Sequence, residues 1–316
     1  MKKNWILLFC CLNLIAYGQQ DFFAKSKTTN KDLRINSFVK GSLLQPRVQS
    51  NVLAIIIPGS GPTDRNGNQQ FTRNDALKKL AEGLAEDGIA SFRFDKRVLT
   101  LLEQGVLDEK KFRFEDFVTD VVSVVHFFKQ RSSYSAIFLI GHSQGSLVGA
   151  LTSQEIPVTG FISLAGAGQS IDRTIINQIK LQQPGLEKKA EVSFAELIET
   201  GRVRDYDISL DAILNPDTQA FMVSWMRYDP SEEIKKVTVP ILIIGGSKDL
   251  QSSKEEFLHL VNARPDAAQL YIQGMNHVFR MVTGNNLENA KTYNQPNRPI
   301  APTLLTTVVN FIKKHS

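Results

Sequence analysis

The sequence predicts an α/β fold in which a mostly parallel central sheet is flanked by helices and carries a helical cap insertion. Short, continuously apolar stretches at residues 52–57, 136–140 and 241–244 are typical of strands buried on both faces of a parallel sheet. Amphipathic helical stretches alternate with these strands, as a parallel sheet requires. Between residues 170 and 229 only helix-like segments occur, and this change of pattern predicts the cap.

The composition is that of an ordinary globular protein with room for a large core. Of the 316 residues, 42% are hydrophobic, and 37 lysines and arginines stand against 32 aspartates and glutamates. Without Lys2 and Lys3, which lie in a segment expected to be removed, the balance is 35 against 32. So near a balance, without a basic run, gives no reason to expect a nucleic-acid partner.

Residues 1–18 have the parts of a secretory signal peptide. Lys2 and Lys3 precede a short apolar stretch at residues 5–17, and a small-x-small cleavage site ends at Gly18. A membrane-spanning helix usually needs about 20 apolar residues, more than this stretch offers. We therefore expect an exported protein, periplasmic or extracellular, with no stable membrane span after cleavage.

Both cysteines of the chain, Cys10 and Cys11, lie inside this N-terminal segment. A lipid anchor on one of them is a less favoured alternative, because Phe9 stands where a small residue would be expected. After cleavage the chain would contain no disulfide, no thiol nucleophile and no cysteine metal site.

Residues 19–50 are mostly polar and carry a short alternating apolar pattern at Leu33, Ile35 and Val39. Alternation of this kind predicts N-terminal strands or a hairpin that adds an antiparallel edge to the sheet. The main α/β domain is then expected at residues 51–316, with its helical cap at about residues 170–229.

A serine stands at the apex of a predicted strand, turn and helix. Residues 141–145 read GHSQG, and a helical stretch begins at Gln144. Gly141 and Gly145 remove side chains that would crowd so sharp a turn, which lifts the Ser143 hydroxyl clear of the sheet. The first N–H groups of the helix face the same point and favour negative charge there. The pattern predicts that Ser143 is a nucleophile.

A glycine-rich loop, residues 58–62, follows the strand at residues 52–57. Acyl transfer needs a second backbone donor opposite the serine, and only a chain with little side-chain bulk can approach that closely. The Ser60 N–H is the candidate, paired with the Gln144 N–H, although a loop that merely turns the chain has the same composition. Asp64 and Arg65 are expected to hold the loop in shape by a local pair.

The next predicted strand, residues 89–94, ends in the charged triplet Asp95, Lys96 and Arg97. A surface salt-bridge network explains such a triplet more readily than a place in a site, although the end of a strand permits both.

The cap contains four large apolar residues, and two roles are open for them: Phe221, Met222, Trp225 and Met226. They could form an apolar wall for an acyl group, or they could be the cap's own core, which is the slightly favoured interpretation.

Three reactive residues follow predicted buried strands: Ser143, Asp249 and His277. The carboxyl ends of parallel strands share one edge of a sheet, so these residues can converge there. An imidazole can take the serine proton and return it to the leaving group, while a carboxylate orients the imidazole. Asp217 and Asp266 are alternative carboxylates, but neither directly follows a buried strand. His142 is expected to belong to the turn and to point elsewhere.

In these motifs and their order, the chain resembles the α/β-hydrolase superfamily, and within it the bacterial serine aminopeptidase and lysophospholipase-like hydrolases. The likeness extends from about residue 51 to the C-terminus and is carried by residues 58–62, 95–97, 141–145, 248–251 and 274–277. One departure is Pro58, which stands where many relatives have a histidine.

The resemblance implies a role for each site residue. Ser143 would be the nucleophile, His277 the general base and then acid, and Asp249 the residue that orients it. The backbone N–H groups of Ser60 and Gln144 would form the oxyanion hole. An acyl-serine intermediate would be hydrolysed by water, with neither a metal nor an organic cofactor.

The function expected from the sequence is hydrolysis of small to medium acyl esters by an exported serine hydrolase. An amidase or serine aminopeptidase using the same three residues is an alternative, since the triad does not discriminate between leaving groups. A catalytically silent binding protein is a third possibility, against which the complete set of reactive residues argues. In either enzyme the partner is a small-molecule ester or amide.

Overall fold

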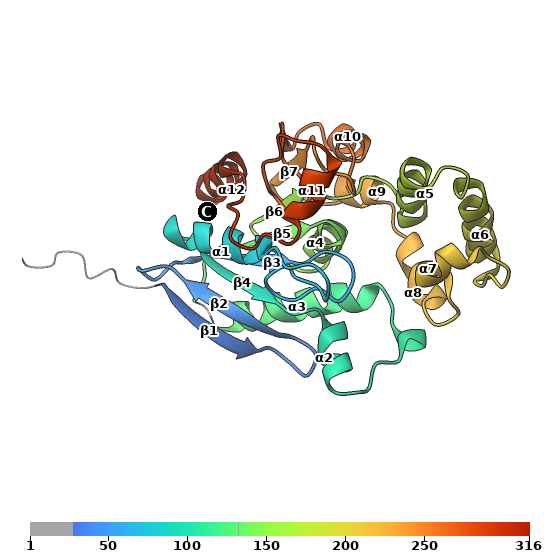
Figure 1. The fold of residues 1–316 in the computed structure, drawn as a ribbon. Coiled ribbons are helices and arrows are strands. Elements are labelled where there is room, and N and C mark those ends of the chain that lie inside the picture. Colours follow the sequence, from blue (N-terminus) through green and yellow to red (C-terminus); the bar gives the residue numbers. More distant parts are fainter. Residues whose placement is uncertain (1–27, 132) are drawn as a thin grey trace, which may run out of the picture.

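A computed structural model describes residues 28–131 and 133–316 and is built around one eight-stranded sheet (Figure 1). The strand order is β1-β2-β4-β3-β5-β6-β7-β8. The bounds of the strands are β1 Thr29–Arg34, β2 Lys40–Gln45, β3 Val52–Ile57, β4 Ala90–Phe94, β5 Ala136–His142, β6 Gly160–Leu164, β7 Ile241–Gly246 and β8 Ala268–Ile272. The expected signal peptide, with Cys10 and Cys11, lies outside the described residues.

The sheet is parallel from β4 to β8, and a hairpin of β1 and β2 adds an antiparallel edge. The central strands β3 and β5 are in register from Val52 beside Ala136 to Ile57 beside Gly141. Their side chains are almost all buried, because helices cover both faces and each face must be apolar. The predicted mostly parallel α/β fold is confirmed.

Two apolar layers hold the helices against the sheet. On one face, α1 and α12 pack on the strands around Leu80, Phe138 and Leu304. On the other face, α3, α4 and α10 pack around Phe92 and Phe128. The helices of these layers and their connections are α1 Ala76–Glu86, α2 Arg97–Glu103, α3 Glu115–Gln130, α4 Gln144–Glu155, α9 Pro230–Lys235, α10 Lys254–Ala263, α11 Asn286–Thr292 and α12 Pro302–His315.

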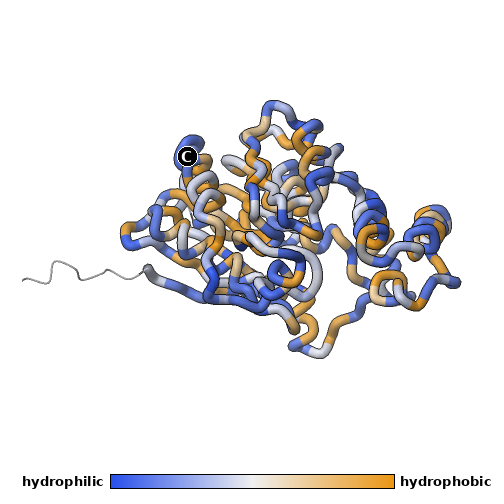
Figure 2. The backbone as a smooth tube through the Cα atoms, turned by 45° about the horizontal axis from the view of Figure 1, so that its top comes forward, coloured by the Kyte–Doolittle hydropathy of each residue, from blue (hydrophilic) through white to orange (hydrophobic). Residues whose placement is uncertain are grey.

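Four helices between β6 and β7 form a group of their own beyond the sheet (Figure 1). They are α5 Ile171–Gln182, α6 Glu187–Thr200, α7 Asp211–Leu214 and α8 Gln219–Met226. A separate small core of Phe194, Leu197, Leu214 and Met222 joins them. Figure 2 shows apolar and hydrophilic residues interspersed along the same helices, whose apolar residues supply this core.

None of the described helices combines the length and the apolar character needed to cross a membrane.

Candidate active site

The turn from β5 to α4 places Ser143 in a strained conformation. Its φ is 55° and its ψ is −122°, a region that residues with side chains rarely occupy. The turn is tight because α4 approaches the end of β3. A Cβ added at Gly145 would lie 2.5 Å from Ile57 O and 2.7 Å from Pro58 O. Glycine at this position is therefore a steric requirement of the fold.

The loops after β7 and β8 bring Asp249 and His277 into direct contact. His277 Nδ1 and Asp249 Oδ2 are 2.8 Å apart, and the two side chains are 6% and 1% exposed. The second carboxylate oxygen of Asp249 accepts hydrogen bonds of 2.8 Å from the N–H groups of Gln251 and Ser252. With its oxygens held in this way, Asp249 fixes the ring of His277 and leaves Nε2 as the ring atom free to exchange a proton with a substrate.

Ser143 and His277 line the same two cavities, of about 200 Å³ and about 150 Å³. In the described part of the chain, the Ser143 hydroxyl makes no hydrogen bond to the His277 ring. Such bonds are often long in an enzyme without substrate and shorten when substrate binds.

The two alternative carboxylates lie elsewhere and have partners of their own. Asp217 Oδ1 is 3.3 Å from Lys110 Nζ, and Asp266 Oδ2 is 2.9 Å from Arg264 Nη2. Of the three candidates, Asp249 is the one that contacts His277.

The expectation that His142 points away from the site is wrong. His142 Nε2 is 2.9 Å from the backbone oxygen of His277, and the two rings lie 4.7 Å apart. Burial and the neighbouring His277 lower the pKa of His142 to about 3, so the ring is neutral. Its Nε2–H therefore donates to His277 O, and this bond anchors the backbone that carries the His277 ring.

The loop after β3 lies directly against the serine turn. A Cβ added at Gly59 would lie 3.2 Å from Ser143 Cβ, so the backbone comes close to the hydroxyl. The carbonyl of the next residue, Ser60, accepts hydrogen bonds of 2.8 Å from Thr63 Oγ1 and from Gln69 Nε2. Within the described residues, the Ser60 N–H donates no hydrogen bond to a protein group.

Gln144 is the first residue of α4, so its N–H has no intrahelical partner. Ser60, Ser143 and Gln144 line one cavity. The two residues predicted to carry the oxyanion donors therefore line a cavity that Ser143 also lines.

The charged triplet after β4 is not a surface network. Asp95, Lys96 and Arg97 are 8%, 4% and 8% exposed, and each has a separate partner. Arg65 forms its main pair with Asp95, at 2.7 Å, and not with Asp64, so the expected local pair is wrong as well. Asp64 instead accepts from the N–H groups of its own loop.

Arg97 binds Asp120 and Asp116 of α3 at 2.6 and 2.7 Å. Lys96 turns the other way, toward the glycine-rich loop and α4. Lys96 had no predicted role of its own, because the strand pattern shows where the triplet starts and not how its side chains diverge.

A third cavity, of about 360 Å³, lies between the cap and the main domain. Phe221, Met222 and Trp225 line it, whereas Met226 does not and belongs to the cap core. Met222 is also 4% exposed within that core, so both expected roles apply to it.

Part of this cavity's wall comes from the connection between α2 and α3, which contributes Leu107, Glu109 and Phe112. Phe112 stands 5.8 Å from the Phe221 ring, and Phe114 stacks on Trp225 at 5.5 Å. The Phe114 N–H also donates to Ser224 Oγ of α8 at 2.8 Å. Aromatic contacts and this hydrogen bond tie the cap helix α8 to the start of α3.

Across residues 28–131 and 133–316, no three His, Cys, Asp or Glu side chains are grouped so that they could hold a metal ion.

A mostly parallel sheet with a strained serine turn between a strand and a helix defines a class of protein. The chain has this fold, and the family and sequence matches that follow support the α/β-hydrolase superfamily. Residues 74–195 match the serine aminopeptidase (S33) family, a segment that contains Ser143 but ends before Asp249 and His277.

The comparisons with individual proteins point to esterases. EstD, an esterase of Thermotoga maritima, is 23% identical over 283 residues, which cover 88% of this chain and 66% of EstD. The chain thus spans just under two thirds of the length of that relative. Est1E from Butyrivibrio proteoclasticus has a TM-score of 0.58 at 17% identity, over 90% of this chain and 98% of Est1E. A thermostable carboxyl esterase from Bacillus coagulans has a TM-score of 0.60 at 14% identity, over 92% and 99%.

Proposed function

We propose that the protein is a serine hydrolase that cleaves carboxylic esters of small to medium acyl groups through an acyl-serine intermediate. Ser143 Oγ attacks the ester carbonyl carbon while His277 Nε2 takes the hydroxyl proton. The carbonyl oxygen becomes an oxyanion that accepts from the N–H groups of Ser60 and Gln144. The C–O bond to the alcohol then breaks, and His277 returns the proton to the departing oxygen. Water repeats the sequence on the acyl-serine and releases the acid.

The observation that carries this proposal is the buried contact of 2.8 Å between His277 Nδ1 and Asp249 Oδ2, on the walls of the cavities that the strained Ser143 also lines. A carboxylate in this position holds the imidazole in the tautomer that can accept the serine proton, and it stabilises the imidazolium that forms.

The cavities suggest how a substrate would lie. The cavity of about 360 Å³ under the cap is lined mainly by apolar side chains, among them Ile213, Phe221 and Trp225, which suits an acyl chain. The smaller cavities border His277, where the leaving alcohol must receive its proton. An acyl group in the cap cavity and an alcohol beside His277 place the ester carbonyl at Ser143.

An aminopeptidase or amidase with the same residues is a second candidate, because the matched family is described as serine aminopeptidase. Among the described residues, no Asp, Glu, Lys or Arg lines the two cavities at Ser143, and Gln169, Thr174 and Gln178 are among their polar residues. The acyl part of either substrate would lie in the cap cavity, where Glu109 is one carboxylate among mainly apolar side chains. Such a lining suits an acyl chain better than an aminoacyl group with a free ammonium. Ester hydrolysis is therefore the preferred function.

Labelling with a fluorophosphonate probe tests the reaction class. The wild-type protein is expected to take up the probe, and Ser143→Ala is expected to take up none. Ser133→Ala, an exposed serine in the loop before β5, serves as the matched control and should label like wild type. Wild-type protein that stays unlabelled would contradict the proposal, and labelling of Ser143→Ala would mean that another serine reacts.

The substrate class follows from a second experiment. We expect p-nitrophenyl esters of rising acyl length to be cleaved with higher kcat/KM than aminoacyl p-nitroanilides. A higher kcat/KM for the anilides would favour the aminopeptidase.

Export is proposed from the sequence of residues 1–18 alone. Expression of the full-length chain in a bacterial host should yield a periplasmic or extracellular protein whose N-terminus follows Gly18. Recovery of the uncleaved chain from the cytoplasm, measured by intact mass, would contradict export. A mass increase at Cys10 or Cys11 would indicate the lipid-anchored alternative instead.

A further inference from the structure

Lys96 is the buried residue that contacts both predicted oxyanion donor segments. It follows β4 and caps the start of α2, and it is 4% exposed. Its Nζ donates to Gly59 O at 3.0 Å and to Gln144 Oε1 at 2.6 Å. Nζ also lies 3.8 Å from the centre of the Phe117 ring. In its protonated form the amino group has three N–H bonds, and these three partners match them in number.

The first of these bonds fixes the peptide that carries one donor. The carbonyl of Gly59 and the N–H of Ser60 belong to the same planar trans peptide, in which the two groups point in opposite directions. A Gly59 carbonyl turned toward Lys96 therefore turns the Ser60 N–H away from it. Because the Gly59 backbone lies against Ser143, the direction of this peptide decides where the Ser60 N–H points relative to the serine turn.

The second bond fixes the residue that carries the other donor. Gln144 is the first residue of α4, and its N–H needs a constant direction relative to Ser143. Its side chain is buried and bound to Lys96, so the side chain and the Gly59 carbonyl are held by a single atom. The relative position of the two donors depends on that atom.

The charge of Lys96 has no direct counterion. Among the described carboxylates none lies within 4.0 Å of Nζ, and the one in the same pocket, Asp120, is bound by Arg97. Glu109 borders the far side of the cap cavity that Lys96 also lines. Burial lowers the pKa of Lys96 to about 7, and the negative charge of Asp120 opposes this only in part. An unpaired buried cation is costly, so residues of this kind are often functional.

We propose that Lys96 is a positioning residue for the oxyanion hole, which aligns the Ser60 and Gln144 N–H groups by binding the Gly59 carbonyl and the Gln144 side chain. The inference rests on the proposed serine hydrolase function. Lys96 does not touch the reacting atoms itself. Its loss should weaken transition-state stabilisation while leaving substrate binding nearly intact.

The main test is Lys96→Met, which keeps an unbranched side chain only one heavy atom shorter and removes its donors. Active sites are counted by fluorophosphonate labelling, so that misfolded protein does not lower the apparent rate. We expect kcat per labelled site on a p-nitrophenyl ester to fall about 10²-fold with KM little changed, as when oxyanion donors are lost. Lys313→Met, at the opposite end of the sheet, should keep the wild-type kcat.

A second variant keeps the proposal testable if Lys96→Met does not fold. Lys96→Ala should be phosphonylated slowly, and added ethylammonium, which can occupy the vacated position, should accelerate its labelling. Ethanol, a neutral molecule of similar size, should not. Phosphonylation is read out because an amine could also attack an acyl-enzyme and raise turnover by a different route.

The outcomes separate the two proposals. No labelling of the wild type would refute the hydrolase itself. Labelled wild type together with an unchanged kcat in Lys96→Met would overturn the role of Lys96, as would a variant in which KM rises and kcat does not. Absence of rescue by ethylammonium in a folded Lys96→Ala would also count against it.

Discussion

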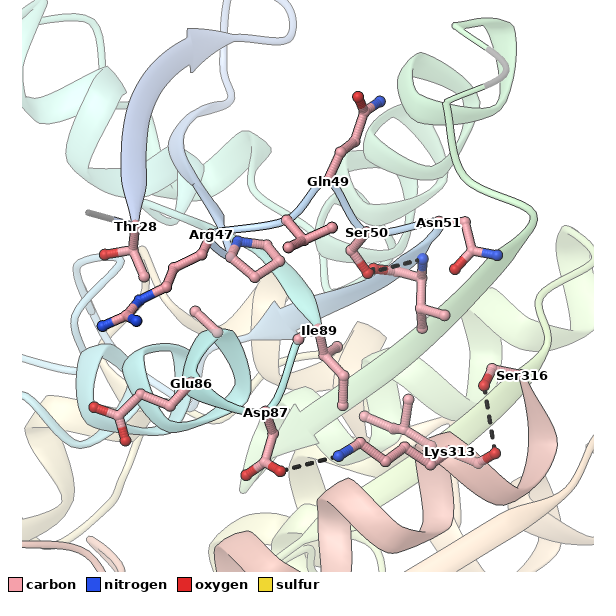
Figure 3. Close-up of a pocket in the computed structure, with 16 residues that line it drawn as sticks. Thr28, Arg47, Gln49, Ser50, Asn51, Glu86, Asp87, Ile89, Lys313 and Ser316 are labelled. Carbon is pink, nitrogen blue, oxygen red and sulfur yellow. Dashed lines mark hydrogen bonds and ion pairs between the residues drawn. The ribbon is translucent and has the colours of Figure 1, made fainter. Parts of the chain in front are cut away.

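The cavities at the two ends of the parallel strands differ in volume, and the larger one is not the one with the reactive groups. A cavity of about 840 Å³ lies at the amino ends of β3 and β4, where Asp87 pairs with Lys313 at 3.0 Å (Figure 3). The cavities at the carboxyl ends are smaller, at about 360, 200 and 150 Å³.

The reactive groups are nevertheless at the carboxyl ends. A strained serine, a buried His–Asp contact and N–H groups at the start of a helix meet there. At the amino end, Figure 3 shows mostly exposed polar side chains that point in different directions, such as Arg47, Gln49 and Glu86. Ligands of open α/β sheets bind at the carboxyl ends of the strands because helix N-termini and functional loops gather there. Convergence of reactive groups is thus a better guide to a site than size.

The largest contrast is expected from one chemical change made at both ends. Asp249→Asn at the carboxyl end should lower kcat about 10⁴-fold, because an amide no longer holds the His277 tautomer or stabilises the imidazolium. Asp87→Asn at the amino end makes the same change and should leave kcat unaltered. Steady-state kinetics on a p-nitrophenyl ester measures both. Similar losses in the two variants would remove the distinction between the ends.

A smaller effect is expected from the pH dependence of stability. Burial lowers the pKa of Lys96 from 10.5 to about 7, so between these values the unfolded chain holds a proton that the folded chain has released. The free energy of unfolding of the wild type therefore gains up to about 1.4 kcal/mol per pH unit in this window, and below it the burial cost is fully present. Lys96→Met lacks this contribution.

Urea unfolding at pH 7 and pH 9 checks this prediction. The difference in unfolding free energy between wild type and Lys96→Met should shift in favour of the wild type as the pH rises. Lys313→Met, whose lysine is half exposed, provides the comparison at the other end of the sheet. A difference that stays constant with pH would show that Lys96 keeps an ordinary pKa.

The cap cavity should respond to a change in its volume. Ile213→Trp, in α7, is expected to lower kcat/KM about tenfold for a p-nitrophenyl octanoate and hardly at all for the acetate, because only the longer acyl chain needs the space that is filled. Ile198→Trp, on the exposed side of α6, is the control. Equal losses on both esters would mean that the acyl chain lies elsewhere.

The smallest effect is expected at the amino end. The Asp87–Lys313 pair is about half exposed, so a double-mutant cycle of Asp87→Asn and Lys313→Met should give a coupling energy of at most about 1 kcal/mol. Thermal or urea unfolding measures it. A larger coupling energy would show that the Asp87–Lys313 pair contributes substantially to the stability of the fold.

The sequence was most informative where backbone rules leave few choices. Continuous apolar runs predict buried parallel strands, and residues that follow such runs must share one edge of the sheet. For this reason, Ser143, Asp249 and His277 could be chosen before their separation was known, and the strained turn at Ser143 follows from its flanking glycines.

The directions of side chains could not be predicted from the sequence in the same way. The GHSQG pattern contains His142, but nothing in it shows that the ring bonds to His277 O. The triplet Asp95, Lys96 and Arg97 resembles a surface network because charged residues are mostly exposed. In the structure each of the three is buried and bound to a different partner, and these partners lie in segments distant in sequence.

The cap was predicted as a group of helices, but the origin of its pocket was not. The helical pattern of residues 170–229 carries no sign that Phe112 lines the same cavity or that Phe114 stacks on Trp225. Phe114 and its hydrogen-bond partner Ser224 in α8 are 110 positions apart in the sequence. Contacts between segments so far apart are set by tertiary packing and not by local periodicity.

The contacts of α8 with the connection between α2 and α3 have a consequence for exchanging the cap between related proteins. The cap cavity is built partly by the cap and partly by the connection between α2 and α3. Phe114 joins this connection to α8 by ring stacking on Trp225 and by its hydrogen bond to Ser224. A chimera that exchanges residues 170–229 alone would place a foreign helix on the native Phe112 and Phe114. Transfer of chain-length preference between related enzymes should therefore require both segments, moved together as one graft.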